Sequence, residues 1–125
     1  MKPETNLTTA ELRLANLIWE KGDLPSPELV NIANEKLNWH KSTTYTVLRK
    51  LCQKGIFANK KAQVTILIGP DELAALGSRR FVDEAFNGDL PRFVAAFIGD
   101  KKLSAKQIDE LKRIIDDHEG ADSNG

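Results

Sequence analysis

The spacing of apolar residues predicts an amphipathic helix near the start of the chain. The helix is expected over residues 8–21, and its buried face carries Ala10, Leu14, Leu17 and Ile18. Thr8 is suited to cap this helix, and Glu11 three residues later completes a capping box. Gly22 then follows as the C-terminal stop.

Two further helices follow at the same apolar period. The second is predicted over 27–37, with Ser26 as its cap. The third begins with Ser42 as its cap and ends at Gly55. Its inward face carries Thr44, Val47, Leu48, Leu51 and Cys52, whereas its free face is polar and basic. Three short helices of this kind are typical of a helix-turn-helix arrangement.

The next apolar residues change to a strand-like pattern. Two β-branched and aromatic segments, 56–61 and 64–68, predict a hairpin. Ala62-Gln63 is expected at its tip, directly after Lys60 and Lys61. A hairpin of this kind beside a helix-turn-helix forms a wing.

The connections around these elements suggest where the first domain ends. The short connection over 38–41 holds Trp39, which is expected to pack across the junction of the helices. This connection could also form a short strand that pairs with the hairpin. Gly69-Pro70 ends the hairpin and marks the expected end of a first domain, residues 1–70.

The remaining chain is predicted to form an arm of three helices over 71–118, each apolar on one face. Ser104 is expected to cap the last of them, with Gln107 at the capping-box position. Such short helices rarely bury enough surface alone, so a second copy of the chain is expected to cover them. The alternative is that they pack back on the first domain of the same chain. Residues 119–125 are predicted to be a disordered tail. The residues expected at the dimer interface are Phe81, Phe86, Phe93, Val94, Phe97, Ile98, Ile108, Leu111, Ile114 and Ile115.

The fold class predicted from this pattern is mainly α with a small β wing, a winged helix-turn-helix domain followed by a three-helix dimerisation arm. Charge divides in the same way, because residues 1–70 carry a net charge of +4 and residues 71–125 carry −4. Between Glu35 and Asp71 stand seven Lys and Arg residues and no acidic residue. Chance is the alternative explanation of the division, but the unbroken cationic run argues against it.

A helix and a hairpin that carry only positive charge fit the phosphate backbone of double-stranded DNA. Thr43 and Thr46 are expected to contact base edges, and Arg49 a guanine or a phosphate. The alternative is a polar helix face that is merely solvated. A third interpretation is a winged-helix module whose basic face binds an acidic protein partner. The expected DNA-binding residues are Ser42, Thr43, Tyr45, Thr46, Arg49, Lys50, Lys54, Lys60 and Lys61.

Other classes of function find little support in the sequence. No apolar run approaches the length of about 20 residues that a membrane helix needs, and the first residues lack the apolar core of a signal peptide. The single cysteine, Cys52, excludes an internal disulfide, fits a reducing cytoplasm, and is expected in the core rather than as a redox switch. His40 and His118 are far apart, so no metal site is expected. No catalytic constellation and no cofactor motif is visible, so an enzyme is not expected.

Several of these segments together resemble the penicillinase and methicillin-resistance repressor family (BlaI/MecI). The resemblance covers roughly residues 7–118, and its order and spacing are more specific than its single segments. The matching segments in the first half are Leu7-Thr8-Thr9-Ala10-Glu11, Leu17-Ile18-Trp19-Glu20-Lys21-Gly22, Ser42-Thr43-Thr44-Tyr45-Thr46-Val47-Leu48-Arg49-Lys50-Leu51 and Lys54-Gly55. Those in the second half are Phe81-Val82, Phe86-Asn87-Gly88-Asp89, Leu103-Ser104 and Glu110-Leu111.

The resemblance implies a dimeric repressor of a palindromic operator that a membrane sensor-protease pathway removes in response to a β-lactam. The family's cut precedes a phenylalanine in the middle helix of the arm, which here implies the bond between Ala96 and Phe97. The best-known members have asparagine where this chain has Ala96. The wing also departs from the family's usual Gly-Arg tip, and the C-terminal cysteine cluster of copper-responsive relatives has no counterpart here.

Overall fold

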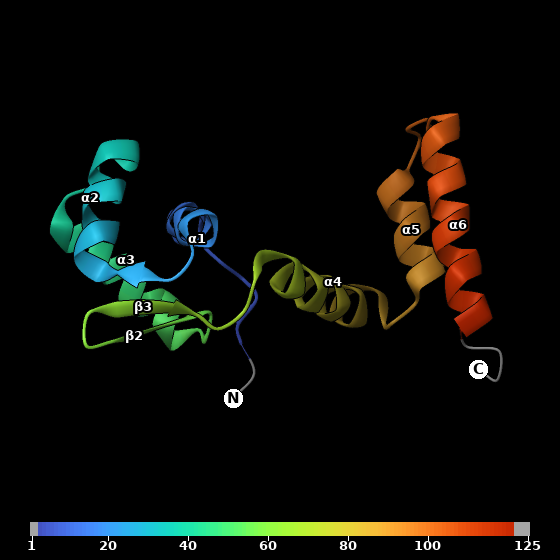
Figure 1. The fold of residues 1–125 in the computed structure, drawn as a ribbon. Helices are drawn as coiled ribbons and strands as arrows, with labels where there is room; N and C mark the ends of the chain where they lie inside the picture. Colours follow the sequence, from blue (N-terminus) through green and yellow to red (C-terminus); the bar gives the residue numbers. More distant parts are fainter. Residues whose placement is uncertain (1–2, 122–125) are drawn as a thin grey trace. The chain divides into compact units, whose positions relative to one another are not determined.

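The computed structural model describes residues 3–121 as two compact units, which divide between Phe81 and Val82. The first unit contains α1 (Thr9–Lys21), β1 (Leu24–Pro25), α2 (Ser26–Leu37), α3 (Lys41–Gln53), β2 (Phe57–Lys60) and β3 (Gln63–Ile66) (Figure 1). Helix α4 (Pro70–Phe86) crosses the division, and α5 (Leu90–Ile98) and α6 (Ala105–Ala121) belong to the second unit. The predicted class, mainly α with a small β wing, is confirmed. Of the predicted tail, 119–121 continue α6, whereas 122–125 lie outside the described residues.

The start of α1 follows from a local signal in the sequence. The Thr8 hydroxyl accepts a hydrogen bond from the Glu11 amide at 3.1 Å, and the Glu11 carboxylate accepts one from the Thr8 amide at 2.8 Å. Two backbone donors that the first turn leaves unpaired are therefore satisfied reciprocally. This confirms the predicted capping box, and the helix ends before Gly22 as expected.

The starts of α2 and α3 differ from the predictions. Ser26 and Ser42 were expected as caps, but the caps are Pro25 and His40, and neither makes a side-chain capping bond. Ser26 is the first residue of α2 because its amide is held from outside the helix, by the carbonyl of Ala62 at 2.8 Å. Helix α3 begins two residues earlier than a cap at Ser42 would place it, because the His40 carbonyl already accepts the Thr44 amide.

The sheet is three-stranded and antiparallel, in the order β1-β3-β2. Its first strand is Leu24–Pro25, so the strand considered over 38–41 is wrong. In this region α2 ends at Leu37, its C-cap Asn38 adopts a left-handed conformation with φ 59°, and Trp39 donates its amide to the carbonyl of Ala33. Leu24 lies opposite Val64, and both side chains are buried. Pairing across the core, rather than a local pattern, therefore creates β1.

The wing turns one residue earlier than the sequence suggested. Lys60 pairs with Gln63, which leaves Lys61 and Ala62 as the two turn residues in place of Ala62-Gln63. Both have positive φ, 52° and 61°, as a two-residue hairpin turn of type I′ requires. Asparagine and glycine are the residues that this turn usually selects. The hairpin therefore closes on residues that fit its backbone poorly.

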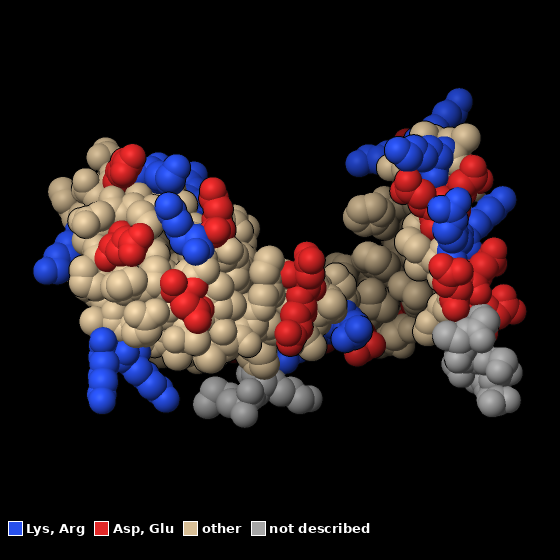
Figure 2. All heavy atoms as spheres, viewed as in Figure 1, with Lys and Arg blue, Asp and Glu red and all other residues tan. Residues whose placement is uncertain are grey.

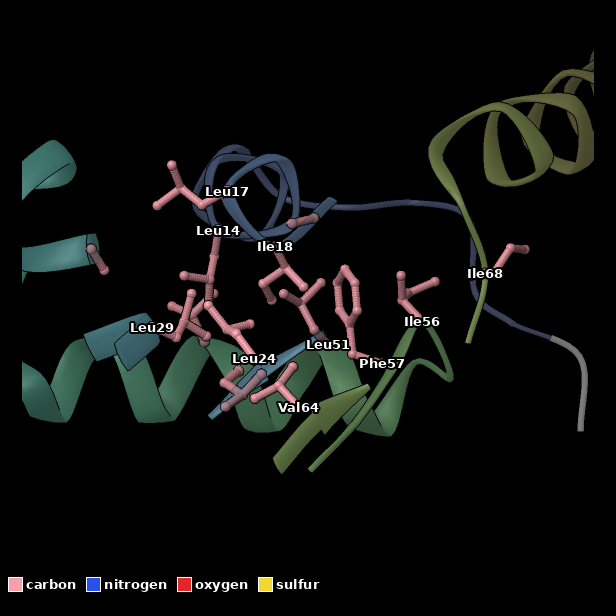
Figure 3. Close-up of a cluster of buried hydrophobic side chains, with 14 of the residues drawn as sticks. Leu14, Leu17, Ile18, Leu24, Leu29, Leu51, Ile56, Phe57, Val64 and Ile68 are labelled. Atoms are coloured by element: carbon pink, nitrogen blue, oxygen red, sulfur yellow. The ribbon is translucent and has the colours of Figure 1, made fainter. Parts of the chain in front are cut away.

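One core holds the first unit together. Figure 3 shows side chains from α1, α2, α3 and the hairpin meeting there, including Ile18, Leu29, Leu51, Phe57 and Val64. Each such buried side chain stabilises the fold by about 1.5–3 kcal/mol. Leu73 joins the same core, so the first turns of α4 pack on this unit.

Trp19 fixes the exit of the chain toward α4. Its ring lies 5.8 Å from that of Phe57, and its indole nitrogen donates to the carbonyl of Ile68 at 3.0 Å. Trp39 is half-buried against the core, as its position between the helices predicted.

The second unit has little interior of its own. Within residues 82–119, where side chains are described, Val82 alone is buried. Helix α5 is capped by the Asp89 carboxylate, and α6 by a Ser104–Gln107 capping box that the sequence predicted. The rings of Phe86, Phe93 and Phe97 contact one another in series at centroid distances of 5.5 and 5.9 Å.

Candidate nucleic-acid interface

Helix α3 has one buried and one exposed face. Thr44, Val47, Leu48 and Leu51 point into the core, as predicted, and Cys52 is half-buried beside them. The opposite face is polar, and its exposed side chains are Ser42, Thr43, Thr46, Arg49, Lys50 and Gln53. The core therefore holds α3 by one side only and leaves hydroxyl, amide, guanidinium and ammonium groups facing solvent.

The wing adds a second exposed basic element. Lys60 and Lys61 are both exposed, at the end of β2 and in the turn. Figure 2 shows Lys and Arg side chains projecting beyond the end of this hairpin. Because residues 36–70 contain no acidic residue, none of the basic side chains on α3 or the wing has an anionic neighbour in this stretch. Such a surface attracts a polyanion.

Tyr45 projects from α3 toward the start of α2. It is half-buried, and its hydroxyl lies 3.4 Å from that of Ser26, whose side chain is buried. Ser26 also donates its amide to Ala62 in the wing turn. These two contacts connect α3 to the tip of the hairpin through Ser26, the first residue of α2.

A shallow cavity of about 260 Å³ lies between α3 and β2. It is lined by Tyr45, Leu48, Arg49, Cys52 and Asn59. Asn59 was not among the predicted site residues, although it is exposed and lines the same cavity as Arg49. Only the strand register, in which Asn59 pairs with Val64, could have identified it. Burial raises the pKa of the Cys52 thiol, which therefore stays protonated.

Lys54 is placed differently from the other predicted DNA-binding residues. Its ammonium donates to the carboxylate of Glu11 and, at 2.8 Å, to the carbonyl of Asn6. The Glu11 residue is only 2% exposed. Burial by itself raises the pKa of Glu11, but hydrogen bonds from Lys54 and Thr8 outweigh it and leave the pKa below its usual value. Lys54 thus neutralises a buried carboxylate.

The second unit exposes a large apolar surface. Helices α5 and α6 lie side by side (Figure 1), and a groove of about 400 Å³ runs between them. Six of the residues predicted at the dimer interface line this groove: Phe93, Val94, Phe97, Ile98, Leu111 and Ile114. Ile108 and Ile115 are also exposed on α6, Phe81 is exposed on α4, and Phe86 is half-buried. Ala96 and Phe97 are exposed neighbours within α5, and Phe97 is 76% exposed.

None of the helices within residues 3–121 is long and apolar enough to span a membrane. In the same part of the chain, no group of three or more His, Cys, Asp or Glu side chains is arranged to hold a metal ion.

A helix-turn-helix whose third helix is followed by a basic antiparallel hairpin defines the winged-helix class, which is consistent with DNA binding. The sequence profile of one family, described as "Penicillinase repressor", matches residues 7–117. The chain belongs to this penicillinase repressor family, a family of transcriptional repressors.

Individual relatives are similar over nearly their full length. The penicillinase repressor of Bacillus licheniformis is 25% identical over 122 residues, which cover 94% of this chain and 95% of that protein. The methicillin resistance regulatory protein MecI of Staphylococcus aureus (strain N315) is 24% identical over 113 residues, or 87% of this chain and 92% of its own length. An uncharacterized 16.5 kDa protein in the ptsI 3' region of Latilactobacillus sakei is 31% identical over 120 residues, or 92% and 82%.

Proposed function

We propose that this protein is a dimeric transcriptional repressor that binds double-stranded operator DNA through α3 and the wing. The observation that carries the proposal is the exposed polar face of α3 beside a basic hairpin, in a stretch without acidic residues. Helix α3 enters the major groove, where base edges can be read, and the wing neutralises phosphates. Membership of a repressor family supports this assignment.

The proposed contacts divide by chemistry. Thr43 and Thr46 read base edges or pack their methyl groups on thymine, and Arg49 binds a guanine or a phosphate. Lys50, Lys60 and Lys61 neutralise phosphates, with Ser42 and Tyr45 contacting phosphate or sugar. We do not assign Lys54 to this surface, because its ammonium already has two partners within the protein.

The second unit supplies the dimer contact in this proposal. The groove between α5 and α6 exposes Phe97, Leu111 and Ile114, side chains that a single chain leaves in water. The same surface of a second copy can cover them. Each Å² of apolar surface that this removes from water stabilises the dimer by about 25 cal/mol. A dimer then presents two copies of α3 to a palindromic operator, with half-sites about one helical turn or a small multiple apart.

Sedimentation and a salt-dependent gel shift test this function together. We expect a dimer that binds a two-site duplex at low salt and whose affinity falls steeply as salt rises, because counterions are released from phosphates. A monomer without DNA affinity at low salt would contradict the proposal. A protein that ignores DNA but binds an acidic protein would instead favour the protein-interaction module.

We also propose that proteolysis in α5 ends repression, at the bond between Ala96 and Phe97 and through a membrane sensor-protease pathway. In the single chain, helix α5 is nine residues long and has no buried residue, so its local opening costs little free energy once the proposed dimer has dissociated. Mass spectrometry of the repressor from cells treated with a β-lactam should detect a fragment that ends at Ala96. Ala96→Asn is the matched variant, since it places the residue of the best-known family members before Phe97.

A further inference from the structure

The segment Pro3 to Leu7, which we call the strap, precedes α1 and lies along the end of α3. The amide of Glu4 donates to the carbonyl of Lys54 at 2.9 Å. The ammonium of Lys54 donates in turn to the carbonyl of Asn6 at 2.8 Å. Lys54 therefore holds the strap at two points, once through its backbone and once through its side chain.

The other side of the strap contacts α4. The guanidinium of Arg80 donates to the carbonyl of Pro3 at 2.8 Å. One turn earlier, a Cβ built at Gly77 would lie 3.4 Å from the Cβ of Thr5. A glycine inside a helix is destabilising relative to alanine. A Cβ at Gly77 would itself make only an ordinary van der Waals contact with Thr5, so alanine would fit, whereas a longer side chain would push the strap away.

The Glu11 carboxylate anchors this arrangement to the core unit. Glu11 is part of the α1 capping box and is almost fully buried, and Lys54 is its charged partner. Removing the ammonium of Lys54 would leave a buried carboxylate without its countercharge, so Lys54 has a role inside the protein that does not involve DNA. The contacts thus run from α1 to the end of α3, along the strap, and on to α4.

We propose that the strap couples the end of the DNA-reading helix α3 to α4, with Lys54 and Arg80 as positioning residues. This inference rests on the proposed function, because the coupling matters for a dimer that reads two half-sites. The strap holds α4 to the winged helix as far as Arg80, so less of the chain between the DNA-binding unit and the dimer arm is free to move. The coupling therefore makes the dimer selective for the spacing of its half-sites.

Two variants of the full chain test whether the contacts of the strap with α4 couple the two segments. Arg80→Met keeps an unbranched apolar stem but removes the guanidinium that donates to Pro3, and Gly77→Leu keeps Arg80 but displaces Thr5. Arg79→Met is the matched control, since Arg79 is the exposed neighbour on the same helix. Gel shifts are measured with duplexes whose half-site separation changes in steps of one base pair, together with amide hydrogen exchange of free protein.

Release of the strap should reduce the preference for the best spacing over its neighbours by roughly fivefold, the effect of one lost hydrogen bond. The α4 amides from Leu73 to Gly77 should exchange several-fold faster, whereas Arg79→Met should match the unmodified protein in both measurements. If either Arg80→Met or Gly77→Leu keeps the original preference and exchange, the coupling is wrong. If the unmodified chain binds no DNA, the proposed function fails, and the exchange rates alone decide on the strap.

The role of Lys54 is tested through the salt dependence of DNA binding. Lys60→Met should lower the slope of log affinity against log salt by about 0.9, the value for one phosphate contact. Lys54→Met should weaken binding without changing this slope, and the Glu4 amide should exchange faster in the free protein. A slope that falls equally in both variants would make Lys54 a phosphate contact and overturn its positioning role.

Discussion

Lys61 and Ala62, the two turn residues of the wing, adopt left-handed backbone conformations although neither is glycine or asparagine. Such a conformation costs an ordinary residue roughly 1–2 kcal/mol. The turn persists because its neighbours fix it, with Lys60 paired to Gln63 and the Ala62 carbonyl held by Ser26. The strain in the wing is therefore local and can be relieved by substitution.

Ala62→Gly should raise the free energy of unfolding by about 0.5–1 kcal/mol, because glycine accepts a positive φ without a steric penalty. Urea unfolding followed by circular dichroism measures the change. Ala58→Gly in β2 is the control, and there glycine should lower stability, since it only adds freedom to the unfolded chain. A loss of stability at both positions would contradict the strained turn.

Glu11 makes the free energy of unfolding fall when the solution becomes acidic. Its folded-state pKa lies below its usual value of 4.5, because the hydrogen bonds from Lys54 and Thr8 outweigh burial. A carboxyl group of this kind contributes stability in full above pH 4.5, and the contribution is lost as the pH falls through the lower folded-state pKa. The stabilisation by Glu11 is thus present at neutral pH and absent in strong acid.

Glu11→Gln should destabilise the protein near pH 7 and flatten the fall of stability below pH 4.5. Unfolding midpoints measured in urea from pH 3 to pH 7 provide the comparison. Glu20→Gln, at an exposed position of the same helix, is the control and should retain the original pH profile. If both variants have the same profile, the Glu11–Lys54 pair contributes nothing measurable.

Lys54 is a residue whose partner could not be predicted from the sequence. In the sequence it is one of the cations in an acid-free run, which is why it was grouped with the DNA-binding residues. Its acidic partner, Glu11, lies 43 positions earlier in the chain. The capping box at the start of α1 already explained why an acidic residue stands at position 11, so nothing in the sequence pointed to a second partner. Only the fold brings the two charges together.

At the scale of elements, prediction succeeded where the deciding contacts are local. The capping boxes at Thr8 and Ser104 involve residues three positions apart, and both were predicted correctly. It failed where a distant contact decides. Ser26 starts α2 rather than capping it because the wing holds its amide, and β1 exists because Leu24 pairs with Val64.

In the proposed function, Arg49 on α3 can read a base whereas Lys60 on the wing only neutralises a phosphate, so their loss should affect DNA binding differently. Arg49→Ala should weaken operator binding roughly tenfold or more and relax discrimination at one base pair, if its guanidinium reads a guanine edge. Lys60→Ala should weaken binding less, equally on all sequences, and with a smaller salt slope. Competition gel shifts with operator and unrelated duplexes separate the effects. Equal losses would make Arg49 only a phosphate contact.

At the scale of the whole molecule, the sequence separates charge and apolar surface between its two parts. Residues 1–70 are basic and supply most of the core that holds α3, to which Leu73 adds, whereas residues 71–125 are acidic and leave many apolar side chains exposed. The periodicity of α5 and α6 was sufficient to identify those side chains. It could not show what covers the groove between these helices, because in the proposed dimer the covering surface belongs to a second copy of the chain.

Ile114 offers a direct test of that closure, since it lines the groove, is 65% exposed and lies outside the proposed DNA surface. Ile114→Glu would place a carboxylate in an apolar interface, where burying an unpaired charge is costly. We expect the dimer dissociation constant to rise by about 100-fold or more. Sedimentation measures this change, and gel shifts should show weaker binding to a two-site operator with unchanged affinity for one half-site. The control, Lys112→Glu, introduces the same group at an exposed position of α6 away from the groove. If Ile114→Glu remains as dimeric as Lys112→Glu, the apolar groove is not the interface, and two-site binding needs another contact.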